Sequence, residues 1–129
     1  MRLLLAALLT GVALPAATLP AMAGEIWVTN EKDDTVSVID VETLKVVNTY
    51  PTGERPRGIT FSKDFSRVYI CASDSNTVQV MDPNTGEILH DLPSGEDPEQ
   101  FVLAPDDRHL YIANEDDARR FAEEALVGF

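Results

Sequence analysis

The sequence predicts an all-β domain made of repeated four-stranded antiparallel sheets, and three observations lead to this prediction. First, a 42-residue repeat brings Trp27, Tyr69 and Tyr111 into one column. Second, short segments rich in Val, Ile, Tyr or Thr alternate with turns of Gly, Pro, Asn or Asp, which is typical of strands joined by tight turns. Third, the pattern between Glu25 and Ala113 has no helical periodicity.

The repeat holds its register over two full copies, residues 27–68 and 69–110, and a third copy begins at residue 111. Ten of the 42 aligned positions are identical between the two full copies, and no insertion or deletion separates them. Strand and turn residues keep the same order: IWVTN aligns with VYICA and LYIAN, TVSVID with TVQVMD, and PTGERP with PSGEDP. Self-similarity of this kind indicates one supersecondary unit that recurs along the chain.

The repeat also places the individual strands. Three strands are expected between Ile26 and Tyr50. The second copy predicts strands near 67–72, 76–82, 87–92 and 99–104. Both alternating sets of residues in strands such as VSVIDV are apolar, so we expect both faces of the sheets to be covered. Four strands in about 42 residues match the blade of a β-propeller, and a small β-sandwich is the alternative.

The first 23 residues have the pattern of a secretory signal peptide. A basic start at Arg2 precedes an apolar run from Leu3 to Ala17, and small residues follow at Ala21 and Ala23. A membrane anchor is the alternative, but the run is shorter than the roughly 20 residues that a membrane-spanning helix needs. We therefore expect cleavage after Ala23 and a periplasmic location. N-terminal sequencing of the exported protein should start at Gly24, and a product that starts at Met1 would contradict this prediction.

Composition excludes several classes of partner. The chain has 22 acidic and 10 basic residues and a formal net charge of −12. Such a surface repels phosphate backbones and anionic lipids, so we expect no nucleic-acid binding and no membrane association after signal cleavage. Cys71 is the one cysteine, which excludes an intramolecular disulfide. Its repeat counterparts are Thr29 and Ala113, so we interpret Cys71 as a small buried strand residue.

The motifs of common catalytic sites are missing from the sequence. It contains no G-x-S-x-G, C-x-x-C, H-E-x-x-H, P-loop or G-x-G-x-x-G pattern. Asp33, Asp34, Asp116 and Asp117 are clustered, but they lack the alternating acids and central glycine of a calcium loop, so we interpret them as solvated turn residues. The sequence therefore predicts no catalytic residue, no metal site and no cofactor.

The motifs of the repeat resemble those of a known family. IWVTN, TVSVID and the G-x-x-P turn resemble the YVTN-type β-propeller repeats of exported bacterial proteins. More narrowly, VTNEKDDTVSVID, YICASDSNTVQVMD, LPSGEDPEQF and LYIANEDDA are similar to the N-terminal blades of periplasmic β-propeller proteins associated with PQQ-dependent catabolism. The resemblance covers residues 24–118, which we expect to form a partial propeller.

The resemblance implies a closed propeller of about seven blades, of which this chain holds about two. In such families the innermost strand of each blade follows the G-x-x-P turn, which here implies innermost strands at 57–62 and 100–105. The first three strands then lack an innermost strand of their own. In a complete relative, the C-terminal strand would supply it and close the ring.

Residues 119–129 depart from the repeat. Arg119 and Arg120 stand where the repeat would place Thr and Val. Phe121, Ala125 and Leu126 have helical spacing, so the pattern predicts a short non-repeat tail with helical character. We expect a truncated or frame-shifted product, with a terminal cap as the alternative. Open sheet edges would then permit edge-to-edge self-association.

The candidate binding residues lie in the G-x-x-P turns, GERPRG at 53–58 and GEDPEQ at 95–100. If innermost strands follow these turns, their side chains ring one mouth of the channel. The copies differ there in charge or size, as an asymmetric binding site would require: the candidates are Arg55, Arg57, Asp97, Glu99 and Gln100, with Gly58 opposite Gln100 in the alignment. The alternative is that these are variable exposed loop positions. Gly53 and Gly95 are expected to accept positive φ.

Taken with the resemblance, these residues predict a binding or accessory module in periplasmic PQQ-dependent alcohol catabolism. Its expected partner is a small molecule or a periplasmic quinoprotein dehydrogenase. The alternative is a fragment of a propeller enzyme or cofactor-binding subunit of the quinoprotein, haem or lactonase type. We expect no enzymatic activity from this chain, because cofactor ligands would have to come from several further blades.

Overall fold

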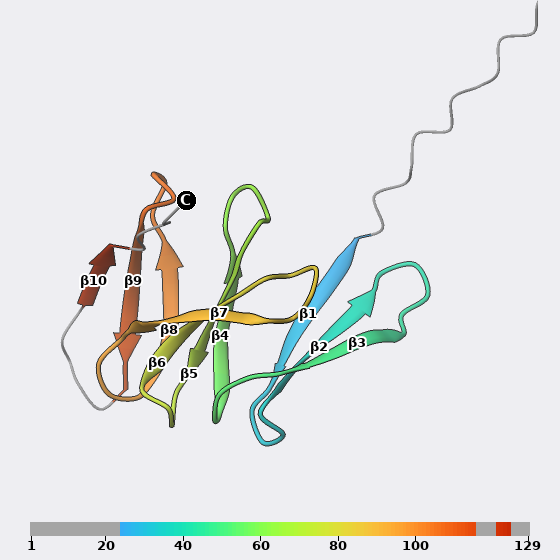
Figure 1. The fold of residues 1–129 in the computed structure, drawn as a ribbon, viewed down its shortest axis with the longest axis horizontal. Helices are drawn as coiled ribbons and strands as arrows, with labels where there is room; N and C mark the ends of the chain where they lie inside the picture. Colours follow the sequence, from blue (N-terminus) through green and yellow to red (C-terminus); the bar gives the residue numbers. More distant parts are fainter. Residues whose placement is uncertain (1–23, 116–120, 125–129) are drawn as a thin grey trace, which may run out of the picture.

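The computed structural model describes residues 24–115 and 121–124, which form strands joined by turns (Figure 1). The strands in chain order are β1 Glu25–Asn30, β2 Thr35–Asp40, β3 Val46–Pro51, β4 Pro56–Phe61, β5 Val68–Ala72, β6 Thr77–Met81, β7 Ile88–Pro93, β8 Pro98–Leu103, β9 His109–Asn114 and β10 Phe121–Glu124. The all-β prediction is confirmed. None of the described residues belongs to a helix that could cross a membrane. The predicted signal peptide at 1–23 lies outside the described residues.

The strands form three antiparallel sheets, which fan out side by side in Figure 1. The first sheet is β1-β2-β3, the second is β4-β5-β6-β7 and the third is β8-β9-β10. The complete second sheet therefore begins at the strand that follows a G-x-x-P turn. The first sheet has three strands with β1 at its edge, as the resemblance implied. This succession of sheets is that of incomplete propeller blades.

Irregularities in strand pairing recur at equivalent positions of the repeat. The pairing of β2 with β3 shifts between Val38 and Ile39, and that of β6 with β7 shifts between Val80 and Met81. These two sites lie 42 residues apart. Because β-bulges bend a strand and increase its twist, the outer strands β3 and β7 have the same local distortion at equivalent positions. The sequence repeat is thus also a repeat of backbone geometry.

The prediction of a helical tail is wrong for residues 121–124. These residues form β10, which pairs antiparallel with β9 and places Ala122 opposite Tyr111. The register is the one that β6 uses on β5, where Val80 lies opposite Tyr69. The edge of β9 presents backbone groups that need partners, and this requirement outweighs the weak helical spacing of a short segment. The other residues of the predicted tail lie outside the described residues.

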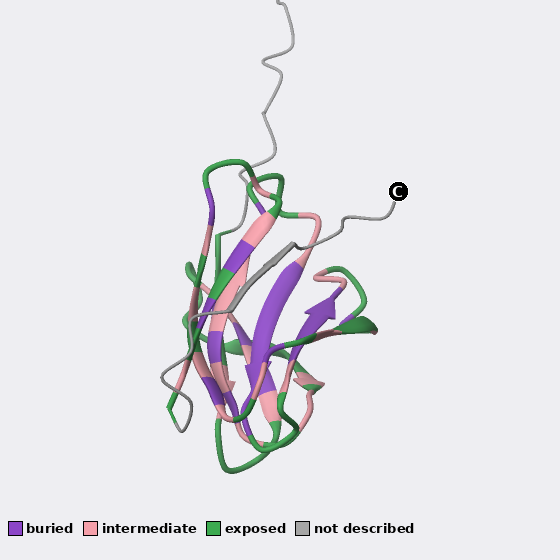
Figure 2. Cartoon of the chain, turned by 90° about the vertical axis from the view of Figure 1, so that its left-hand side faces the viewer, coloured by how far each residue is buried: buried purple, intermediate pink, exposed green. Residues whose placement is uncertain are grey.

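Two separate apolar clusters hold the three sheets together. The first and second sheets meet at Trp27, Val36, Val38, Val68, Ile70 and Met81. The second and third sheets meet at Tyr69, Cys71, Val78, Val80, Leu110 and Ile112. Successive residues of β5 serve opposite clusters, so every residue of that strand is buried, as the purple strands in Figure 2 indicate. A sheet covered on both faces was predicted, and two cores exclude a two-sheet sandwich for the described residues.

Cys71 lies in the second of these clusters with no exposed surface, which confirms its interpretation as a buried strand residue. Burial raises the pKa of its thiol to about 12. Because the thiolate is the reactive form, we expect no labelling by a thiol reagent at pH 8 in the folded protein. In denaturant one thiol per chain should react. Rapid labelling without denaturant would contradict the burial of β5.

The loops after β2 and β6 show how the two copies tolerate different residues. Leu44 and Gly86 occupy equivalent positions, and both have positive φ, 54° and 72°. Each donates its N–H to the carbonyl oxygen four residues earlier, Asp40 or Asp82. A Cβ on Gly86 would overlap the ring of Tyr50 in the first sheet, whereas Leu44 is exposed. Only the second copy therefore requires glycine for space as well as for conformation.

Replacing Leu44 by glycine should stabilise the protein by about 0.5–1 kcal/mol. The left-handed conformation costs a residue with a side chain about 1–2 kcal/mol, and the greater freedom of glycine in the unfolded chain offsets part of that gain. Urea unfolding measures the change. The matched control is Lys45→Gly next to it, which lacks positive φ and should destabilise. Equal effects of the two substitutions would contradict the explanation.

Candidate functional site

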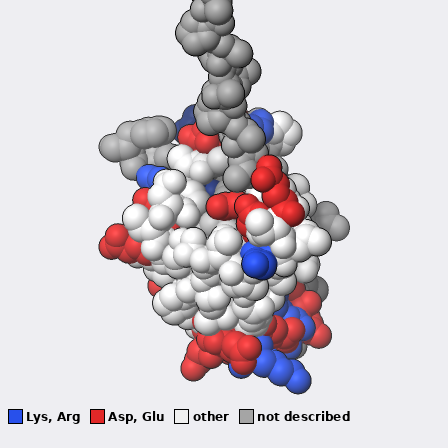
Figure 3. Space-filling model, turned by 90° about the vertical axis from the view of Figure 1, so that its right-hand side faces the viewer, with Lys and Arg blue, Asp and Glu red and all other residues white. Residues whose placement is uncertain are grey.

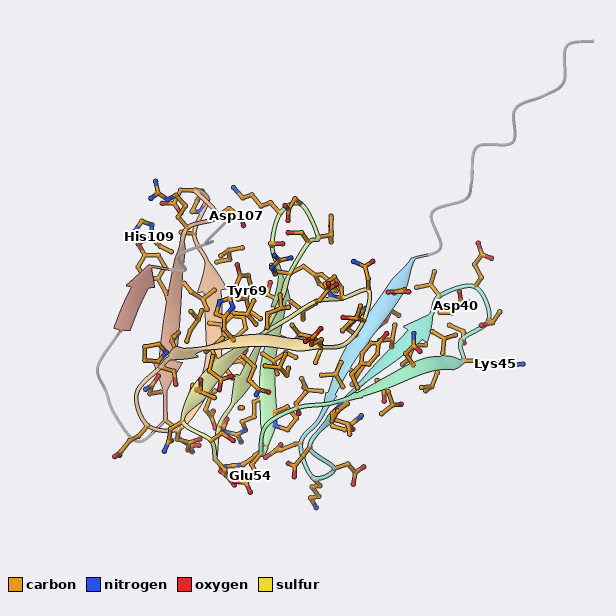
Figure 4. The ribbon with its side chains drawn as sticks, viewed as in Figure 1. Asp40, Lys45, Glu54, Tyr69, Asp107 and His109 are labelled. Atoms are coloured by element: carbon orange, nitrogen blue, oxygen red, sulfur yellow. The ribbon has the colours of Figure 1, made fainter. Side chains whose placement is uncertain are left out.

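The two G-x-x-P turns lie at the same end of the molecule, which Glu54 marks at the bottom of Figure 4. They lead into β4 and β8, and the turns that follow β1 and β5 lie at the same end, as does the C-terminal end of β9 (Figure 1). We call this end the mouth and define it by residues 31–34, 53–58, 73–76, 95–100 and 115. Asp107 and His109 mark the opposite end of the molecule.

Each G-x-x-P turn is fixed by a side chain from a hairpin of the preceding sheet. Arg55 and Asp97 both have positive φ, 56° and 47°. Asp34 Oδ1 accepts a hydrogen bond from the backbone N–H of Arg55 at 2.8 Å, and Asn76 Oδ1 accepts one from that of Asp97 at 2.9 Å. Asp34 and Asn76 lie 42 residues apart, so Asp34 is more than the solvated turn residue we expected. These bonds hold both turns in an otherwise unfavourable conformation.

The glycines of these turns have different roles. Gly95 has a φ of 81°, as predicted, whereas Gly53 is not among the residues with positive φ. A Cβ on Gly53 would lie 2.9 Å from Ala72 Cβ and 3.0 Å from Ser75 Oγ. Its backbone N–H also donates to Gln79 Oε1. The expectation for Gly53 is therefore wrong, since this position needs glycine because the second sheet approaches it closely.

Two arginines from one turn meet carboxylates from all three sheets. Arg55 Nε lies 2.9 Å from Glu31 Oε1, and its Nη1 lies 3.4 Å from Asp74 Oδ1 and 3.8 Å from Asp97 Oδ1. Arg57 Nε lies 3.5 Å from Glu31 Oε1 and its Nη1 3.3 Å from Glu115 Oε2, and it also pairs with Glu99. We call these seven residues the mouth cluster: Glu31, Arg55, Arg57, Asp74, Asp97, Glu99 and Glu115.

The ion pair between Arg55 and Glu31 favours the charged form of both groups. The hydrogen bond from Arg55 lowers the pKa of Glu31, and the same bond raises the pKa of Arg55. The arginine side chains are 33% and 23% exposed, so the guanidinium groups lie partly within the protein while solvent still reaches them. Surface ion pairs add little stability individually, so the significance of this network lies in the fixed charge pattern that it presents.

The structure brings together four of the five candidate residues. Arg55, Arg57, Asp97 and Glu99 form the centre of the mouth cluster, whereas Gln100 lies exposed on β8 outside it. Sequence reasoning missed Glu31, Asp74 and Glu115. A signal was available, because these acids follow strands that the repeat aligns: Glu31 and Glu115 come directly after β1 and β9, and Asp74 is the second residue after β5.

Three of the carboxylates, those of Asp97, Glu99 and Glu115, offer oxygens within 4.8 Å of one another. Oxygen ligands at such spacing could in principle hold a metal ion. Here, however, Arg57 pairs with Glu99 and Glu115, and Arg55 pairs with Asp97. A cation would have to displace both guanidinium groups. The arrangement therefore favours arginine pairing over metal coordination.

Two shallow hollows flank Arg55 at the mouth. One has a volume of about 480 Å³ and is lined by Glu31, Lys32, Asp34, Glu54, Arg55 and Asp74. The other has a volume of about 370 Å³ and is lined by Arg55, Ser73, Asp74, Asn76, Glu96 and Asp97. Both are open and polar. Their chemistry suits a ligand or protein surface that carries charged or hydrogen-bonding groups.

Comparison with known proteins gives one family and several similar folds. A model of the YNCE-like beta-propeller family matches residues 3–121. The chain is 18% identical to hydrazine synthase of Kuenenia stuttgartiensis, with a TM-score of 0.67, covering 79% of this chain and 32% of that one. It is 22% identical to a functionally unknown protein of Desulfotomaculum acetoxidans, with a TM-score of 0.63, covering 72% and 32%. No curated protein matches.

A third similar structure is the dihydro-heme d1 dehydrogenase NirN in complex with DHE. It is 18% identical, with a TM-score of 0.67, covering 87% of this chain and 24% of NirN. The chain thus spans about a quarter to a third of the length of these structures. At such identities the likeness shows the shared fold alone.

Proposed function

This chain belongs to the YNCE-like beta-propeller family, and we propose that it is an exported binding module whose mouth cluster receives the partner. One observation carries the proposal: Arg55 and Arg57 leave a single turn and pair with carboxylates from all three sheets. A charge pattern assembled from several blades depends on the propeller arrangement. Complementary charges on a partner would orient it during association and set its register.

The partner class follows from the motifs that resemble periplasmic propellers of PQQ-dependent catabolism. We propose that the chain is accessory to periplasmic PQQ-dependent alcohol oxidation, where it binds a quinoprotein dehydrogenase or a small molecule. The signal-peptide pattern of residues 1–23 supports the periplasmic location. No reaction is assigned to the chain itself, because the mouth carboxylates are engaged by arginines.

The test is binding of the full chain to a purified periplasmic PQQ-dependent alcohol dehydrogenase, measured by biolayer interferometry. We expect saturable binding that weakens as salt is raised, because screening reduces attraction between exposed charges. Arg55→Gln and Arg57→Gln should each weaken binding by about tenfold, which corresponds to roughly 1.4 kcal/mol.

Lys45→Gln is the matched control, since it removes one positive charge far from Glu54 and the mouth (Figure 4). It should leave the affinity within about twofold, a change of roughly 0.4 kcal/mol. The dehydrogenase is ruled out as the partner if it does not bind. The mouth cluster is ruled out as the binding site if Lys45→Gln weakens binding as much as the arginine variants do.

A further inference from the structure

The described sheets leave two apolar end faces, one at each end of the stack. The first end face consists of Ile26 and Val28, which are 48% and 41% exposed on β1 and point away from the core residue Trp27. Figure 3 views this end of the molecule and shows a largely uncharged surface with a basic group near its middle and acidic groups mostly around it. The last end face consists of Val102 and Tyr111, which are cross-strand partners and are 68% and 52% exposed.

The repeat shows what covers surfaces like the first end face. Ile26 is equivalent to Val68 and Leu110, and both of these counterparts have no exposed surface. In each case the preceding sheet covers them: Val68 packs with Trp27 of the first sheet, and Leu110 packs with Tyr69 of the second. The same kind of surface therefore occurs on all three sheets. It is buried on the second and third sheets and exposed on the first, where it is the first end face.

The same reasoning applies to the last end face with the direction reversed. Tyr111 is equivalent to Trp27 and Tyr69, which are 9% and 2% exposed because the following sheet covers them. Tyr111 has no following sheet among the described residues. The two end faces are thus the two complementary sides of one kind of interface, which the chain already forms twice.

We propose that the first end face docks onto the last end face of a second copy of this chain, head to tail. Each copy carries both sides of the interface, so a second copy suffices as the partner. Two copies that dock at both ends bring six sheets together, which lies within the four to eight blades of closed propellers. Such contacts close into rings when the rotation permits and otherwise extend into longer arrays.

This assembly is independent of the mouth cluster and differs from association through sheet edges. Edge pairing joins backbone groups, and two identical edges can pair with each other. Face docking joins different surfaces through side chains. An interface between two different faces can therefore be recognised from variants, because blocking either face prevents assembly and mixing the two variants restores it.

The test uses the full chain and two variants, Val28→Lys to block the first end face and Tyr111→Lys to block the last. Light scattering after size exclusion should give the wild type a mass of at least two chains and each variant alone the mass of one. An equal mixture of the variants should form a dimer of one copy of each, because each supplies the face that the other lacks.

A monomeric wild type would overturn the proposal, as would a mixture that stays monomeric. Assembly of each variant alone, at the wild-type mass, would indicate edge pairing instead. Circular dichroism checks that both variants retain their strands. If a lysine variant unfolds, Val28→Thr and Tyr111→Thr repeat the experiment with a milder change in side-chain polarity.

Discussion

Replacing Ile70 by alanine is expected to lower the free energy of unfolding by about 2–5 kcal/mol. Ile70 has no exposed surface and lies in the cluster between the first and second sheets. The substitution removes buried methyl and methylene groups and leaves a cavity whose walls belong to different sheets. Because neither sheet can collapse alone to fill that space, the cost should fall well above that of an ordinary surface substitution.

Urea unfolding followed by circular dichroism measures this change. Val47→Ala is the control, since Val47 is 50% exposed and its truncation should alter stability by no more than about 0.5 kcal/mol. If the two substitutions cost the same, the first and second sheets do not share a packed core. That result would contradict the packing of successive sheets against each other.

Replacing Gly58 by alanine is expected to cost about 1–3 kcal/mol, because it forces two backbones apart. A Cβ on Gly58 would lie 2.8 Å from the carbonyl oxygen of Glu99 and 3.2 Å from the Cα of Gln100. Both obstacles are backbone atoms of β8, so a flexible side chain cannot relieve the clash. The shift would also move Glu99 relative to Arg57, which links this stability effect to the mouth cluster.

The repeat provides a matched control for that substitution. Gln100 is equivalent to Gly58 but is exposed on β8, so Gln100→Ala should change stability by no more than about 0.5 kcal/mol. Thermal unfolding of both variants gives the comparison. A Gly58→Ala protein as stable as the wild type would mean that β4 and β8 do not approach each other closely.

Much of the fold could be predicted because each element occurs more than once in the sequence. The strand expected near 76–82 is β6 at Thr77–Met81, and the strand expected near 99–104 is β8 at Pro98–Leu103. β10 could not be predicted, because its residues depart from the repeat and its pairing depends on the open edge of β9. Local spacing in so short a segment carries less free energy than backbone hydrogen bonding along an edge.

The candidate site was predictable only in part. Arg55 and Arg57 could be predicted as candidate binding residues, because their counterparts in the second copy have the opposite charge. The repeat places Glu31 and Glu115 after aligned strands, but their pairing with the arginines could not be deduced. These acids lie far from the arginines in sequence and meet them only when the sheets fan around one mouth. The importance of Asp34 likewise rests on a hydrogen bond between neighbouring sheets.

The central claim is that the three sheets stack in sequence order, so that equivalent residues meet the following sheet in the same way. Nuclear Overhauser contacts in the folded chain test it most directly. The structure predicts contacts between the rings of Trp27 and Phe61, whose centroids are 5.4 Å apart, and contacts of Tyr69 with Leu110 or Ile112. Contacts from Trp27 to the third sheet, or none between Tyr69 and β9, would contradict the stacking.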